Sequence, residues 1–178
     1  MTLLGVALVN GQVPVGSTPN FVYREMPAAQ KEAYAALKSG NMSLGESKLQ
    51  TLLRPGAAHA DLQLATGFAT MAYILRNEGD TARAVQVARL SLAKVAKPQG
   101  RMVARDAVDA LLLAAQLMDH VIGDRAKACE AYEQAIGLEP KAKWAADRLQ
   151  HLRATDESAR QKPRANLLLQ QRAAAPRK

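Results

Sequence analysis

Apolar side chains recur at intervals of three and four residues along most of this chain, which is the spacing of one face of an α-helix. Short polar stretches that contain glycine or proline interrupt this pattern. It predicts helices over residues 27–38, 42–53, 61–77, 81–96, 101–122 and 141–153, and one more between residues 123 and 140. No strand-like alternation of any length occurs after residue 25. The sequence therefore predicts an all-α fold.

Three glycines stand at the polar breaks between consecutive predicted helices: Gly40, Gly79 and Gly123. We expect them to form tight turns that join antiparallel helices. Their spacings are 39 and 44 residues, so the hairpins differ in length. The apolar helix faces are too wide to remain in water. We therefore expect three helix hairpins stacked on one another.

The most regular apolar face lies between residues 123 and 140. Ala128, Tyr132 and Ala135 share it, and Leu138 continues it. This alternation of small and large residues resembles the second helix of a tetratricopeptide repeat, a hairpin of 34 residues. The resemblance covers the second helix better than the first, because Gln116 and Asp119 stand at positions where the family has small or apolar residues.

The hairpin around Gly79 resembles the same family on both helices. Its matching positions are Phe68, Met71, Ala72 and Leu75 in the first helix, and Ala84, Ala88 and Ser91 in the second. In the hairpin around Gly40, Gly45 replaces the usual alanine and preserves a close helix crossing. The resemblance implies a right-handed α-solenoid, with degenerate repeats, that binds peptides along the face of its first helices.

The residues at the binding positions implied by the resemblance are mostly apolar or aromatic. No pair of cations is available there to hold a carboxylate, so we expect an apolar peptide or helix as the partner. The predicted partner groove consists of Tyr34, Tyr73, Arg76, Asn77, Leu113, Leu117 and His120. In the alternative interpretation, these side chains pack against the N-terminal segment or against each other.

Trp144, Leu149 and Leu152 fall along one side of the predicted helix over residues 141–153, and the other side is charged. A helix of this kind covers the open apolar edge of a repeat array. We expect a C-terminal capping helix with Trp144 as its anchor. The alternative is an exposed Trp144 that anchors a partner.

The ends of the chain differ in composition from the repeat region, residues 26–153. Residues 1–25 begin with an apolar run over residues 1–9, which is too short to span a bilayer and has no preceding Lys or Arg. Three interpretations stay open: a truncated signal peptide, an extended segment packed on the helices, or an artefact of the assigned start. The sequence favours a cytoplasmic protein, or a periplasmic or envelope protein if residues 1–11 belong to a signal peptide.

Positive charge is concentrated towards the C-terminus. The formal net charge is +8, and ten basic but only three acidic residues lie in residues 141–178. Within residues 154–178 the candidate contacts to an anionic partner are Arg160, Lys162, Arg164, Arg172, Arg177 and Lys178, preceded by Arg148 and Arg153. Such a tail could contact the phosphates of a nucleic acid or a membrane. It has no aromatic residue for base stacking, so a solvated or protein-docked tail is the competing interpretation.

Residue types with catalytic or ligand-binding chemistry are scattered. His59, His120 and His151 lie in different predicted elements. Asp119 and His120 are neighbours, so on an α-helix we expect their side chains to point to different faces, with His120 at the surface or in the groove. The single cysteine, Cys129, forms no internal disulfide and falls beside an apolar face, which is typical of an inert thiol. We expect no metal site, no cofactor and no enzymatic activity.

These patterns together favour a non-catalytic scaffold or adaptor that binds a protein segment within a larger assembly. No small-molecule substrate and no transmembrane span are expected. Two alternatives stay open. One is a subunit of a ribonucleoprotein or another nucleic-acid assembly that uses the basic tail. The other is an envelope or periplasmic assembly factor.

Overall fold

The computed structural model describes residues 26–53, 60–96 and 104–156, and this part of the chain is helical with no strand. The helices are α1 (Ala28–Lys38), α2 (Met42–Thr51), α3 (Ala60–Asn77), α4 (Thr81–Ala96), α5 (Ala104–Leu117), the π-helical turn η2 (Met118–Ile122), α6 (Arg125–Leu138) and a helix of residues 143–156. The prediction of an all-α fold is confirmed for these residues. The segments 1–25, 54–59, 97–103 and 157–178 lie outside the described residues.

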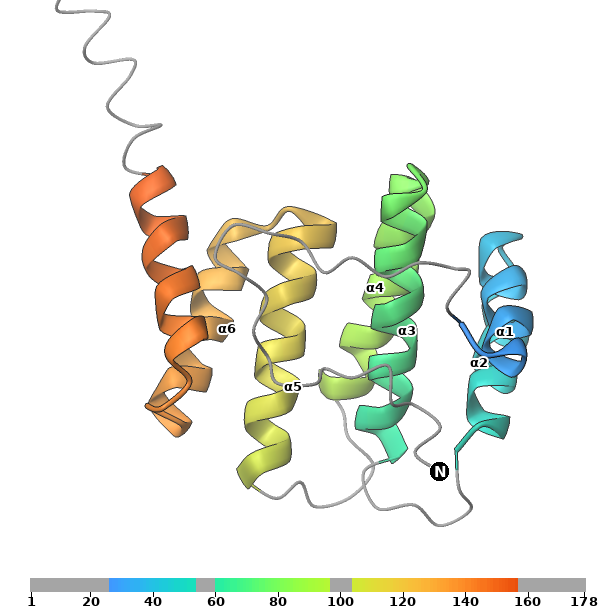
Figure 1. The fold of residues 1–178 in the computed structure, drawn as a ribbon, viewed down its shortest axis with the longest axis horizontal. Helices are drawn as coiled ribbons and strands as arrows, with labels where there is room; N and C mark the ends of the chain where they lie inside the picture. The colour runs from blue at the N-terminus through green and yellow to red at the C-terminus, as the bar shows by residue number, and fades with distance from the viewer. Residues whose placement is uncertain (1–25, 54–59, 97–103, 157–178) are drawn as a thin grey trace, which may run out of the picture.

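Consecutive helices pack in pairs: α1 with α2, α3 with α4, and α5 with α6. Figure 1 shows these pairs side by side, from α1 and α2 at one edge to α6 and the helix of residues 143–156 at the other. Helix α3 also contacts α1 and α5, so neighbouring pairs share a core.

Each pair is joined through a glycine that has a positive φ angle, which only glycine adopts without strain. The φ angles are 92° at Gly40, 90° at Gly79 and 82° at Gly123. The polar residue after each glycine begins the next helix by accepting a hydrogen bond from the backbone N–H three residues ahead. These capping residues are Asn41, Asp80 and Asp124. The predicted turns are confirmed.

The main core lies among the first two pairs, the second half of α5 and η2. Phe68, Met71 and Leu75 of α3 are at most 1% exposed. Alanines at the helix crossings, such as Ala72 and Ala88, are fully buried and allow the backbones to approach closely. The apolar face predicted for this hairpin is therefore confirmed.

Gly45 lies where α2 crosses α1. A Cβ atom at this position would stand 2.4 Å from Cδ2 of the fully buried Leu37. The close crossing expected from the sequence is present, because no side chain separates the two helices here.

A smaller apolar cluster joins α5, α6 and the helix of residues 143–156. Tyr132 is fully buried in it, and Trp144 packs against it, partly buried. The two rings meet edge to face with centroids 6.1 Å apart. Trp144 therefore contributes to packing inside this part of the chain.

Two details differ from the sequence-based expectation. The predicted helix over residues 101–122 is not one regular α-helix, because it changes to a π turn at Met118, where the N–H groups of Gly123 and Asp124 both donate to the Met118 carbonyl. Leu138 does not continue the buried face of α6. It is the last residue of that helix and is 58% exposed.

Candidate functional site

The side chains predicted to form a partner groove lie mostly in the interior. Tyr34, Tyr73, Leu113 and Leu117 belong to the main core, and each is at most 4% exposed. Arg76 is half-buried, Asn77 is exposed, and His120 is buried. The apolar members of the predicted groove therefore pack inside the protein and offer little surface to a partner.

Tyr34 takes part in a polar contact at the edge of this region. Its hydroxyl donates to Oε2 of Glu78 at 2.6 Å, and Nζ of Lys38 lies 2.5 Å from the same oxygen. Both hydrogen bonds lower the pKa of the Glu78 carboxyl, and the one from Lys38 has the larger effect. These contacts connect α1 to the turn that follows α3.

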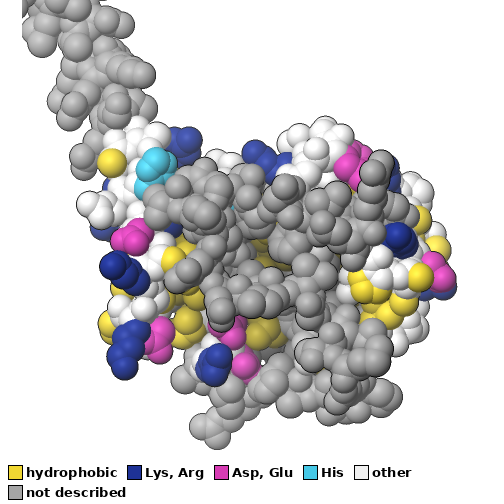
Figure 2. Space-filling view, in the orientation of Figure 1, with side chains coloured by type: hydrophobic (Ala, Val, Ile, Leu, Met, Phe, Trp, Pro, Cys, Tyr) yellow, Lys and Arg dark blue, Asp and Glu magenta, His cyan; other side chains and the backbone are white. Residues whose placement is uncertain are grey.

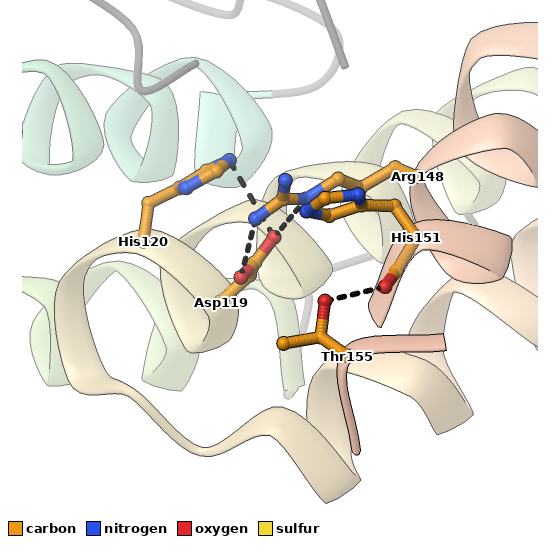
Figure 3. A network of polar contacts seen from close by, with 5 residues as sticks. All are labelled: Asp119, His120, Arg148, His151 and Thr155. Atoms are coloured by element: carbon orange, nitrogen blue, oxygen red, sulfur yellow. Dashed lines mark hydrogen bonds and ion pairs between the residues drawn. The ribbon is translucent and has the colours of Figure 1, made fainter. Parts of the chain in front are cut away.

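A partly buried ion pair connects η2 to the helix of residues 143–156. Nε of Arg148 donates to Oδ2 of Asp119 at 2.6 Å, and Nη2 donates to Oδ1 at 2.9 Å (Figure 3). The side chains are 4% exposed for Asp119 and 13% for Arg148. This two-bond geometry satisfies both charged groups and fixes the direction in which the helix lies.

His120 joins the same network. Its Nε2 lies 3.5 Å from Oδ2 of Asp119, and its side chain is 6% exposed. The expectation that the two neighbouring side chains point to different faces is therefore wrong, as is a surface position for His120. The physical reason is the π turn, which has more residues per turn than an α-helix and so brings successive side chains closer in direction.

Burial lowers the pKa of His120, because the protein interior disfavours the charged imidazolium. The Asp119 carboxylate acts in the opposite direction, and the positive charges of Arg148 and Arg76 oppose protonation. His120 is therefore neutral at physiological pH.

Helix α3 contributes to this region through Arg76 and Tyr73. Nη1 of Arg76 donates to the Val121 carbonyl of the π turn at 3.1 Å. Burial raises the pKa of both Tyr73 and Tyr132, and the charge of Asp119 raises each further, so both phenols stay neutral at physiological pH. The network thus joins three parts of the protein: α3, η2 and the helix of residues 143–156.

His151 and Thr155 lie beside this network on the same final helix. The Thr155 hydroxyl donates to the His151 carbonyl at 2.8 Å, as Figure 3 shows. The His151 side chain is exposed, unlike that of His120. The two histidines therefore experience different environments, although both lie near Arg148.

An open cleft of about 410 Å³ lies where the start of α5 meets the end of α6; we call it the α5–α6 cleft. Its lining residues are Arg105, Val108, Asp109, Leu112, Leu138, Glu139 and Ala142. Partial burial raises the pKa of Asp109, with Arg105 acting in the opposite direction. Figure 2 shows that hydrophobic, basic and acidic side chains occur close together on the face of the molecule in view.

The predicted anionic-partner contacts Arg160, Lys162, Arg164, Arg172, Arg177 and Lys178 lie outside the described residues, as does His59. Arg148 and Arg153, the two candidate contacts that precede them in the chain, belong to the described residues. Arg153 forms an ion pair with Glu133 of α6, and Arg148 forms one with Asp119. Arg148 does not suit a phosphate contact, because its guanidinium is only 13% exposed and is paired with Asp119.

Cys129 is partly buried against the smaller cluster, and burial raises the pKa of its thiol. A raised thiol pKa disfavours the reactive thiolate, in agreement with an inert cysteine. Within residues 26–53, 60–96 and 104–156, no cluster of three His, Cys, Asp or Glu could hold a metal ion. None of the helices in these ranges is long and apolar enough to cross a bilayer.

No protein-family model, curated protein or solved structure matches this chain. The resemblance to tetratricopeptide repeats therefore stays a prediction, and it depends on the small residues at the helix crossings and on the repeated glycine turns.

The ion pair between Asp119 and Arg148 was missed in the sequence, although two signals point to it. Asp119 interrupts a long apolar stretch, and a carboxylate buried in such a stretch requires a cation. Arg148 stands four residues from both Trp144 and Leu152, on the apolar side of its helix. An acid and a base that each interrupt an apolar face are natural partners.

Proposed function

We propose that this chain is a non-catalytic interaction scaffold that binds an apolar segment of a protein partner. In this proposal, α1–α2, α3–α4 and α5–α6 are stacked hairpins of a tetratricopeptide-like α-solenoid, and the helix of residues 143–156 covers its last pair. The corresponding positive-φ glycines in the three turns and the buried alanines at the crossings support this arrangement.

The observation that carries the proposed function is the α5–α6 cleft. Its volume of about 410 Å³ falls in the range of binding pockets. Val108 and Leu112 line it, and Leu138 remains 58% exposed at its side. Complete burial of a leucine side chain stabilises a complex by about 1.5–3 kcal/mol. An apolar partner side chain that covers Leu138 would gain much of this free energy.

The charges around the cleft define the partner further. Asp109 and Glu139 contribute two carboxylates to its lining, and Arg105 contributes one guanidinium. This excess of negative charge favours a partner segment in which a basic residue stands near the apolar one. The partner site therefore lies at this end of α5 and α6, because the apolar residues on the first-helix face are already buried.

A pair of photo-crosslinking variants tests this proposal. The crosslinking side chain replaces Leu138 in one variant and Leu44 in the other, because Leu44 of α2 is also a large exposed hydrophobic residue, 45% exposed. We expect one protein to be captured in native extract from position 138 and not from position 44. Capture that survives nuclease treatment identifies a protein contact without a bridging nucleic acid.

The captured protein is then purified and its affinity is measured by calorimetry. We expect Leu138→Glu to weaken binding about tenfold or more, because it removes an apolar contact worth at least about 1.4 kcal/mol and leaves a carboxylate to be desolvated against the apolar side chain of the partner. Leu44→Glu is the matched control and should leave the affinity unchanged. Equal affinity of wild type and Leu138→Glu would refute the proposed site.

A further inference from the structure

Helices α1, α3 and α5 are each the first helix of a pair. The helix of residues 143–156 follows the third pair and has no described partner helix after it. Helices α1, α3 and α5 each pack beside the helix that follows them in the chain. The described part of the chain stops at residue 156, so it contains no following helix for this last one. The position that such a helix would take is defined by the pairs that precede it.

That position is open at the surface. A cleft of about 520 Å³, here called the terminal cleft, lies between α6 and the helix of residues 143–156. Its lining residues are Ile136, Ala146, Leu149, Gln150, Arg153 and Ala154. The second helices of the first two pairs lie next to one another, because Nζ of Lys94 in α4 is 2.5 Å from Oε1 of Glu46 in α2. The terminal cleft is the equivalent place beside α6.

The sequence contains a segment that suits this cleft. Residues 163–175 read PRANLLLQQRAAA, with a proline in the first turn and strong helix formers after it. Ala165, Leu168 and Leu169 would share one helix face. Six residues, 157–162, connect this segment to the described helix, which is within the usual length of a helix–helix connection.

We propose that residues 163–175 form a helix that packs antiparallel to the helix of residues 143–156 and fills the terminal cleft. A helix that starts beside Arg153 reaches Leu168 after about 8 Å, at a rise of 1.5 Å per residue. Leu149 lies about 6 Å from Arg153 along the other helix by the same measure. Leu168 and Leu169 therefore reach the level of Leu149, where the cleft has its apolar lining.

The length of the connection selects this segment over the other apolar run outside the described residues. Six residues join residues 163–175 to the helix that lines the cleft, whereas the run over residues 1–9 precedes that helix by more than 130 residues. A short connection has a smaller entropic cost of closure than a long one. The segment that follows the helix is therefore the favoured occupant.

Hydrogen exchange on the full-length chain tests the proposal. We expect the amides of residues 165–173 to exchange about tenfold or more slowly than in an unstructured peptide. Ala146→Glu should abolish this protection, because Ala146 is exposed in the described structure and a carboxylate there would be buried under the docked helix. Ala126→Glu, on an exposed part of α6 outside the cleft, is the matched control and should preserve it.

A second pair of variants examines the segment itself. Leu168→Glu should remove the protection of residues 165–173, whereas Gln170→Glu introduces the same charge off the predicted apolar face and should retain it. Rapid exchange of residues 165–173 in the wild type would overturn the proposal. Protection that survives Ala146→Glu would also overturn it, because the helix would then lie elsewhere.

Two other occupants give distinct results. If Ala146→Glu removes protection from residues 2–9 instead, the N-terminal run fills the cleft and the proposal fails. If protection appears only at concentrations where sedimentation shows a dimer, a second copy fills the cleft and the intramolecular assignment fails. Monomeric protein with protected residues 165–173 is the supporting outcome.

Discussion

The two apolar clusters of this protein are held together in different ways. Among the described residues, twenty buried hydrophobic residues form the main core, which extends from α1 to η2. The smaller cluster contains six, and the Asp119–Arg148 pair lies beside it. Apolar burial stabilises in proportion to area and has no direction, whereas a two-bond ion pair fixes an orientation.

This difference shows what each region depends on. In the main core, many apolar contacts share the stabilisation. The helix of residues 143–156 contributes Ala145, Leu149 and Leu152 to the smaller cluster, and the Asp119–Arg148 pair adds a contact with a fixed direction. A buried ion pair contributes little net free energy when intact, but the loss of one partner leaves the other charge unpaired.

The largest effect is expected for Asp119→Ala, which should lower the free energy of unfolding by about 3–5 kcal/mol by leaving the Arg148 guanidinium buried without its partner. Urea denaturation measures this loss. The double variant Asp119→Ala/Arg148→Met removes both charges and should recover most of the stability. A loss below about 1 kcal/mol in the single variant would show that the helix of residues 143–156 does not depend on this pair.

In the main core, we expect Gly45→Ala to destabilise by about 1–3 kcal/mol, because the new Cβ would overlap the buried side chain of Leu37. Gly137→Ala is the matched control. It is also in a helix, but nothing lies within 4 Å of its added Cβ, so helix propensity should stabilise it by up to about 1 kcal/mol. Thermal unfolding of both variants measures the contrast, and shifts of the same sign would contradict it.

The smallest effect is a pH dependence from His120. Its folded pKa lies below its ordinary value of 6.5 because of burial, so the unfolded chain binds a proton first as the pH falls. The contribution of His120 to stability is complete above pH 6.5 and decreases as the pH falls below that value. Between pH 7.5 and pH 5.5 we expect a loss of at most about 1.4 kcal/mol.

Denaturation curves at these two pH values, for wild type and His120→Gln, measure this loss. The variant should lose less stability than the wild type on acidification. His151→Gln is the control, since its side chain is exposed and lies outside the buried network. The lowered pKa values of Glu78 and Asp124 act at lower pH, below about 4.5. An equal pH dependence in wild type and His120→Gln would contradict the assignment.

Much of the helical organisation was predictable from the sequence because its signals are local. The glycines at 40, 79 and 123 each combine a positive φ angle with a capping side chain one residue later. The buried faces of α3 and α4 follow from apolar spacing, and α4 begins and ends at the predicted residues. These features depend on a few neighbouring residues, which a sequence displays directly.

The candidate sites were less predictable, because they depend on contacts between distant segments. The burial of Tyr73 and Leu117 follows from how neighbouring pairs of helices pack, and the π turn that brings Asp119 towards His120 leaves no periodic signal. The exposure of Leu138 depends on where α6 stops relative to α5. Such features are decided by packing geometry between elements, which apolar spacing within one element does not contain.

The glycine turns also have a consequence for the order of events during synthesis. The two helices of each pair are consecutive in the chain and are joined by a short turn, so their contacts are close in sequence. A pair can therefore form soon after it leaves the ribosome. Arg148 follows its partner Asp119 by 29 residues, with all of α6 between them. The helix of residues 143–156 can therefore dock only after α6 has been made, and the Asp119–Arg148 pair is completed only when this last part of the described chain is in place.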